Sequence, residues 1–93
     1  MAVYVDDFRT PAKVAGQRWT MRWSHLGADT DAEFHAFAAR LGLRREWFQD
    51  EDGRFPHYDV TDSTRNRAIA LGAEQVDPYE FVARQQAKHD AAR

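Results

Sequence analysis

A chain of 93 residues, 43% of them apolar and 13% aromatic, can bury one hydrophobic core and is too apolar to be disordered, so we expect a single domain over residues 1–93 whose last few residues fray. Its formal charge of -2 excludes a global attraction to nucleic acid or to an acidic membrane surface. It has no cysteine, which excludes disulfides and thiolate zinc sites, and no signal peptide or long apolar run, so we expect a soluble cytoplasmic protein without membrane contact.

The chain begins with a predicted strand at residues 2–5, which delivers Asp6 and Asp7 from its end. Residues 7–17 are polar and contain proline and glycine, which indicates a loop. Residues 18–24 then alternate between apolar and polar side chains, and this alternation predicts a second strand.

The second predicted strand would place Trp19, Met21 and Trp23 on one face. By the same alternation His25 joins that face and becomes partly buried, provided that the strand extends to Gly27, where we expect it to end. This face would therefore combine indole rings with an imidazole.

A first helix is predicted from a capping box formed by Thr30 and Glu33. Apolar residues then recur at the spacing of one buried helix face, and Gly42 follows as a typical C-terminal residue. The apolar stripe consists of Phe34, Phe37, Ala38 and Leu41.

The second half of the chain predicts two strands, at residues 46–49 and 57–60, around an Asp-Gly turn within residues 50–54. The intervening Pro56 weakens the first pairing between these segments, because proline has no backbone N–H to donate.

The remaining residues predict a helix, a strand and a helix. Asp62 or Ser63 would cap a helix over residues 65–71, residues 73–76 form a short strand, and Asp77 caps the final helix. Strands interleaved with helices predict a small α/β domain, in which about three helices pack against one mixed sheet.

Ionisable side chains occur in three segments where folding alone would favour apolar ones. These segments are residues 5–7, 24–29 and 57–59. On a strand, His57 and Asp59 point to the same face, as two ligands of one metal ion would. We predict that Asp6 completes this metal site, with His25 and Asp29 as further candidate ligands. The alternative is that Asp59 only orients His57 at a polar edge of the sheet.

The candidate catalytic residues are His25, Asp29 and His57. An imidazole titrates near neutral pH, so His25 beside Asp29 would act as a general acid or base. The alternative is a core histidine satisfied by one hydrogen bond. Ser24 is not favoured as a nucleophile, because adjacent strand residues point to opposite faces.

Arginine and tryptophan residues lie in the same stretch, a mixture typical of surfaces that bind phosphates and stack bases. Arg65 and Arg67 add positive charge where the free amides of the second helix favour an anion. The alternative is that the tryptophans are core and the arginines a solvated face. The candidate ligand-binding residues are Arg22, Trp23, Arg65 and Arg67.

Several blocks, spread over residues 2 to about 84, together resemble a family of small bacterial and phage proteins catalogued only as a domain of unknown function. The resemblance implies that the blocks form one unit and implies no activity or cofactor. In the family a proline often follows the aspartate of the first block, so Asp7 departs from the pattern and weakens the hypothesis that Asp6 and Asp7 hold Mg²⁺. The blocks are Val3-Tyr4-Val5-Asp6, Trp23-Ser24-His25-Leu26 with Asp29, Glu33-Phe34-His35-Ala36-Phe37-Ala38 before Leu41-Gly42, His57-Tyr58-Asp59-Val60, Arg65 and Gly72-Ala73.

The first functional hypothesis is a protein that binds a phosphate-containing ligand, either a nucleotide or a nucleic-acid end, in a pocket of His, Asp and Arg. A divalent metal would be the cofactor if the protein is a metal-dependent phosphoesterase. The second is a non-catalytic interaction module, such as a phage or host accessory factor that captures a signalling nucleotide or a protein. A homodimer joined through exposed aromatic residues is a third.

Overall fold

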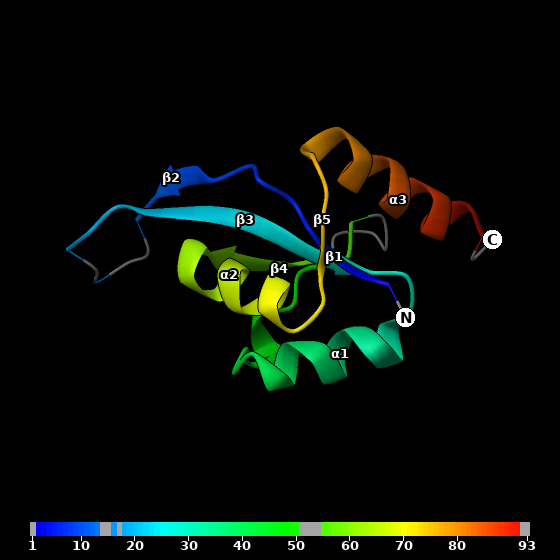
Figure 1. Ribbon diagram of the computed structural model, residues 1–93, viewed down its shortest axis with the longest axis horizontal. Helices are drawn as coiled ribbons and strands as arrows, with labels where there is room; N and C mark the ends of the chain where they lie inside the picture. The colour runs from blue at the N-terminus through cyan, green and yellow to red at the C-terminus, as the bar shows by residue number, and fades with distance from the viewer. Residues whose placement is uncertain (1, 14–15, 17, 51–54, 92–93) are drawn as a thin grey trace.

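The computed structural model describes residues 2–13, 16, 18–50 and 55–91, and it has five strands in one mixed sheet, three α-helices and a short 3₁₀ helix (Figure 1). This confirms the predicted α/β class. No described helix has the length and apolar character needed to cross a membrane. The elements are β1 (Val3–Val5), β2 (Thr10–Ala12), β3 (Met21–Ala28), α1 (Asp31–Arg40), η1 (Arg45–Trp47), β4 (Tyr58–Thr61), α2 (Asp62–Ala70), β5 (Glu74–Gln75) and α3 (Pro78–Ala91).

The long strand β3 organises the sheet. Both β1 and β2 pair antiparallel with β3 along one of its edges, and β4 pairs antiparallel along the other. Strand β5 extends the sheet by pairing parallel with β1. In the register of β3 and β4, His25 lies opposite Asp59, and this pairing positions the candidate site.

The helices cover both faces of the sheet, with α1 and α2 on one side and α3 on the other (Figure 1). The face toward α1 and α2 carries the main core. A smaller cluster of Tyr4, Val76 and Phe81 lies between the other face and α3, which contributes Phe81. The predicted apolar stripe of α1 is buried as expected. The main core includes Val3, Val5, Leu26, Ala28, Phe34, Phe37, Ala38, Leu41, Tyr58, Val60 and Ala68.

Gly27 does not end the second strand as predicted, because β3 continues to Ala28. A Cβ atom at this position would meet the side-chain nitrogen of Gln85, and it would lie 2.9 Å from ring carbons of both Phe81 and Tyr4. The glycine therefore allows α3 to approach the sheet closely.

Two boundaries in the first half differ from the prediction. The expected loop at residues 7–17 contains β2, an edge strand in which Pro11 is tolerated because one row of its N–H groups needs no partner. The following strand begins at Met21, so Trp19 lies outside it with 70% of its surface exposed.

The predicted strand at residues 46–49 is also wrong. Glu46 and Trp47 lie in η1, and only Gln49 pairs with His57, through an isolated bridge. The Asp-Gly turn falls within residues 51–54, which lie outside the described residues.

The helices start near the predicted residues, but not all of the predicted capping hydrogen bonds form. Thr30 is the N-cap of α1, but its side chain makes no capping hydrogen bond. Helix α2 begins earlier than predicted, at Asp62, and Thr61 caps it by accepting a hydrogen bond from the backbone N–H of Thr64. Asp77 caps α3 as predicted, since its carboxylate accepts a 2.8 Å hydrogen bond from the backbone N–H of Glu80.

Candidate metal centre

His25, His57 and Asp59 meet on the face of the sheet that carries α3. One ligand-type atom from each side chain lies within 4.8 Å of the other two. The register of β3 and β4 sets His25 opposite Asp59, and the alternation of the chain returns His57 to the same face. The two imidazole rings stand edge to face with their centroids 5.2 Å apart. Of the predicted residues, these three form a cluster.

The carboxylate of Asp6 orients the imidazole ring of His25 through a hydrogen bond. Its carboxylate oxygen Oδ2 lies 2.7 Å from Nδ1 of His25, and the Asp6 side chain is almost completely buried. Burial alone raises the pKa of Asp6, but hydrogen bonds from the ring and backbone of His25 and from Phe8 outweigh it, so the net pKa is lowered. An ionised carboxylate needs a donor, so Nδ1 carries the proton and Nε2 is the atom suited to bind a ligand.

The position of Asp6 follows from a break between β1 and β2. The backbone N–H of Asp6 still donates to the carbonyl oxygen of His25, and residues 7–9 then leave the ladder. Oδ1 of Asp6 accepts hydrogen bonds from the backbone N–H groups of His25 at 2.9 Å and of Phe8 at 3.2 Å. On the buried face of the sheet, the hydroxyl oxygen of Ser24 accepts a 3.1 Å hydrogen bond from the backbone N–H of Arg9 and so bridges the break. Asp6 therefore supports His25 through hydrogen bonds, and it is not one of the three side chains whose ligand-type atoms cluster.

His57 and Asp59 are also held by neighbouring groups. The Nδ1 atom of His57 lies 2.6 Å from the carbonyl oxygen of Phe55, and its Nε2 atom lies 3.5 Å from Oδ1 of Asp59. Gln49 donates a 2.7 Å hydrogen bond to Oδ2 of Asp59. The adjacent His57 ring lowers the pKa of Asp59 and, with the Gln49 bond, outweighs the effect of burial, so the carboxylate is ionised at neutral pH.

Two imidazoles and one carboxylate are the donor set of many zinc and other transition-metal sites. In such sites each ligand is oriented by a hydrogen bond to a carboxylate, a backbone carbonyl or another polar group. All three donors have a partner of this kind, namely Asp6, the Phe55 carbonyl and Gln49. The residues present therefore fit a divalent transition metal.

Asp29 does not join this cluster. It follows the end of β3, four residues after His25, which corresponds to about 13 Å along an extended chain. Its carboxylate lies 3.6 Å from the guanidinium of Arg84 on α3. The predicted acid–base pair of His25 and Asp29 is therefore not formed.

The predicted arginines also lie elsewhere. Arg22 alternates with Trp23 on β3 and points to the opposite face, where it donates to the carbonyl oxygen of Arg9. Arg65 donates a 2.7 Å hydrogen bond to the backbone carbonyl of Asp6, and Arg67 donates to the carbonyl at the end of α1. Of the four predicted ligand-binding residues, only Trp23 lies beside the cluster.

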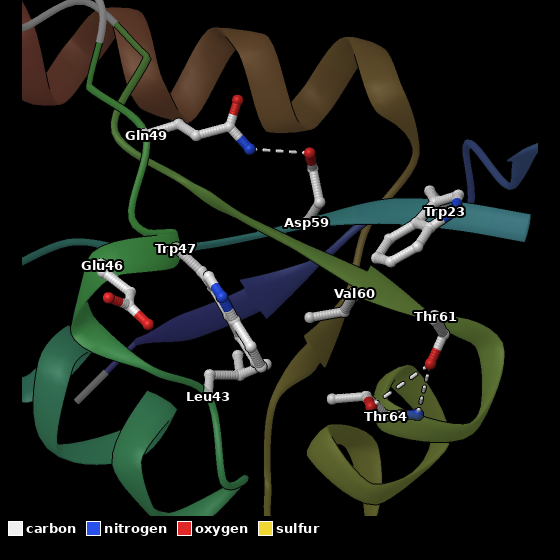
Figure 2. A pocket seen from close by; sticks show the side chains of 9 residues that line it. All are labelled: Trp23, Leu43, Glu46, Trp47, Gln49, Asp59, Val60, Thr61 and Thr64. Atoms are coloured by element: carbon white, nitrogen blue, oxygen red, sulfur yellow. Dashed lines mark hydrogen bonds between the residues drawn. The ribbon is translucent and has the colours of Figure 1, made fainter. Parts of the chain in front are cut away.

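Two hollows adjoin the cluster. The larger, of about 600 Å³, lies along β4 beside η1, and Figure 2 shows the side chains that line it. The smaller, of about 340 Å³, is lined by His25 and by Phe8 of the break between β1 and β2. Trp23 and Asp59 line both hollows, so the cluster of His25, His57 and Asp59 lies where the two hollows meet.

Sequence reasoning missed the contribution of η1 to this region. The sequence predicts a strand for Trp47 and Gln49, whereas Trp47 lines the larger hollow and Gln49 supports Asp59. The signal in the sequence is a tryptophan that directly follows the charged pair Arg45-Glu46. His35, in contrast, is half-buried at the edge of the core, where its Nδ1 lies 3.0 Å from the hydroxyl oxygen of Tyr58 and burial lowers the pKa of the imidazole.

The chain matches a family described as a protein of unknown function (DUF4031) over residues 3–88. The chain belongs to this family. No curated protein and no solved structure matches it. The match confirms the resemblance seen in the sequence blocks and adds no activity or ligand.

Proposed function

We propose that this protein binds a divalent transition metal through His25, His57 and Asp59 and uses it to bind a phosphate-containing ligand. The observation that carries the proposal is the convergence of three donors from two neighbouring strands, each oriented by its own hydrogen-bond partner.

The chemistry follows from the number of protein ligands. His25, His57 and Asp59 would hold the metal, and such a metal would supply Lewis-acid polarisation of a phosphoryl group and a water of lowered pKa. Arg65 and Arg67 are engaged away from the cluster, so the metal itself supplies the positive charge that the phosphate requires. Phosphoester hydrolysis is the activity that this arrangement supports.

Isothermal titration with Zn²⁺, Mn²⁺ and Mg²⁺ tests the metal site. We expect Zn²⁺ to bind more tightly than Mg²⁺, because imidazole ligands favour zinc. His57→Ala and Asp59→Asn should each weaken zinc binding at least about tenfold. Asp7→Asn and His89→Gln are matched controls, since both residues lie outside the cluster, and they should leave the affinity unchanged.

The same protein then tests the phosphate ligand. Inorganic phosphate should bind in the presence of the metal, and a nitrophenyl phosphodiester should be cleaved by wild type but not by His57→Ala. Absence of metal binding below about 1 mM would rule out the proposal. Metal binding without phosphate binding would restrict the protein to the non-catalytic alternative.

A further inference from the structure

We infer that the larger hollow is a nucleobase subsite, which accepts the base of the ligand whose phosphate lies at the candidate metal. The phosphate end of this inference rests on the proposed function. The base end rests on the hollow itself, and the experiment below measures it without any metal.

The hollow has the size and the walls of a small-molecule site. Its volume of about 600 Å³ is within the range of about 300 to 1,000 Å³ that ligand pockets occupy. Figure 2 shows the indoles of Trp47 and Trp23 on opposite sides of Val60, with Leu43 next to Trp47. These side chains provide flat apolar surfaces on which a planar ring can stack.

The charges in the hollow select a neutral ring over an anion. Among the described residues, no Lys or Arg lines it, whereas the carboxylates of Glu46 and Asp59 do. The carboxylate of Asp59 would repel a phosphate placed there, whereas Glu46 is already paired with Arg44 at 2.8 Å. The phosphate of a nucleotide therefore belongs at the cluster of imidazoles, and the uncharged base belongs in the hollow.

Polar groups at the two ends of the hollow match the edges of a base. Gln49 uses its amide nitrogen to hold Asp59, which leaves its carbonyl oxygen as an acceptor. At the opposite end in Figure 2, the hydroxyl of Thr61 caps α2 and donates to the hydroxyl of Thr64, which leaves the Thr64 proton as a donor. A base carries both donors and acceptors on its edge, which suits this combination.

The two parts of the ligand would be joined through Asp59. This residue is a donor of the candidate metal site and also lines the hollow, so a ligand seated in the hollow reaches the cluster without crossing another element. A free nucleotide and a nucleic-acid end share this chemistry of a base with an attached phosphate.

Tryptophan fluorescence tests the base subsite. A Trp19→Phe background removes the exposed indole outside the hollow, so that the remaining signal comes from Trp23 and Trp47. Adenosine titrated in the presence of EDTA should quench this signal. Trp47→Ala should weaken adenosine binding at least about fivefold through loss of a stacking surface, and Trp47→Phe should restore most of it.

Trp47 is half exposed, so its removal should leave the fold intact, which circular dichroism checks. The matched control Trp19→Ala should leave adenosine affinity within about twofold of wild type. No binding of adenosine up to about 10 mM, or equal binding by Trp47→Ala and wild type, would overturn the base subsite while leaving the metal titration to judge the metal centre.

A second comparison identifies the source of the ligand. Tighter binding of AMP than of a short oligonucleotide, both with metal present, would assign a free nucleotide. The reverse order would assign a nucleic-acid end. In either case Trp47→Ala must weaken the binding, and a ligand insensitive to Trp47 would count against the inference.

Discussion

At the scale of single residues, Asp6 links the fold to the candidate site. One of its oxygens replaces the missing ladder contacts at the break between β1 and β2, and the other sets the tautomer of His25. The same carboxylate is thus required by the backbone and by the imidazole. Its substitution should separate these two roles.

We expect Asp6→Asn to weaken zinc binding by about 10- to 100-fold while the protein stays folded. The asparagine oxygen still accepts the backbone N–H groups, but its amide nitrogen donates to Nδ1 of His25 and moves the ring proton to Nε2. That tautomer cannot bind the metal. Titration calorimetry measures the loss, and unchanged affinity in Asp6→Asn would contradict the assigned tautomer. Asp7→Asn, an exposed neighbour, serves as the control.

The lowered pKa of Asp6 also predicts that the free energy of unfolding of the wild type decreases as the solution becomes acidic. A carboxyl whose pKa is lower in the folded state stabilises fully above its unfolded pKa of about 3.9, and this stability is lost as the pH falls through the folded value. Urea unfolding between about pH 5 and pH 2 should therefore show a flatter pH dependence for Asp6→Asn than for wild type.

At the scale of elements, α3 is the helix with the most unusual contact to the sheet. It lies directly on Gly27, and the side-chain amide atoms of Gln85 and the hydroxyl of Tyr4 are buried there without a hydrogen-bond partner among the described residues. Burial raises the pKa of Tyr4 to about 12, and the nearby Asp29 adds to this while Arg84 opposes it, so the hydroxyl stays protonated. Buried polar groups of this kind reduce stability.

Gln85→Met should therefore raise the free energy of unfolding by about 1 kcal/mol. Methionine has a similar shape and lacks the amide whose desolvation is uncompensated, and its flexible chain can pack against Phe81 and Gly27. Gln86→Met, on the exposed side of α3, is the matched control and should change stability by less than about 0.5 kcal/mol. A lower urea midpoint for Gln85→Met would show that Gln85 has a partner that compensates its burial.

At the scale of the whole molecule, the candidate site exists only when β3 and β4 are paired. His25 and the His57–Asp59 segment are separated in the chain by α1 and η1, and the register of the sheet brings them together. Metal binding should consequently be coupled to folding of the sheet.

Zn²⁺ at about 100 times its dissociation constant should raise the free energy of unfolding by about 2.7 kcal/mol. Urea unfolding followed by circular dichroism measures this, and EDTA should reverse it. His57→Ala should show a much smaller increase at the same zinc concentration. An equal increase in wild type and His57→Ala would place zinc binding elsewhere on the molecule.

Local patterns in the sequence were sufficient for several features. The apolar stripe of α1, the Asp77 cap of α3 and the shared face of His57 and Asp59 follow from helix and strand periodicity, which depends only on neighbouring residues. Composition and the order of elements were sufficient for the α/β class.

Other features depend on residues far apart in the chain, and only the tertiary structure decided them. The register of β3 with β4 places His25 opposite Asp59, whereas Asp29 lies beside Arg84. At the break between β1 and β2, Asp6 contacts the ring of His25. Gly27, read as a stop, permits the approach of α3. Periodicity specifies which face a side chain takes, whereas strand pairing and helix packing specify what it meets there.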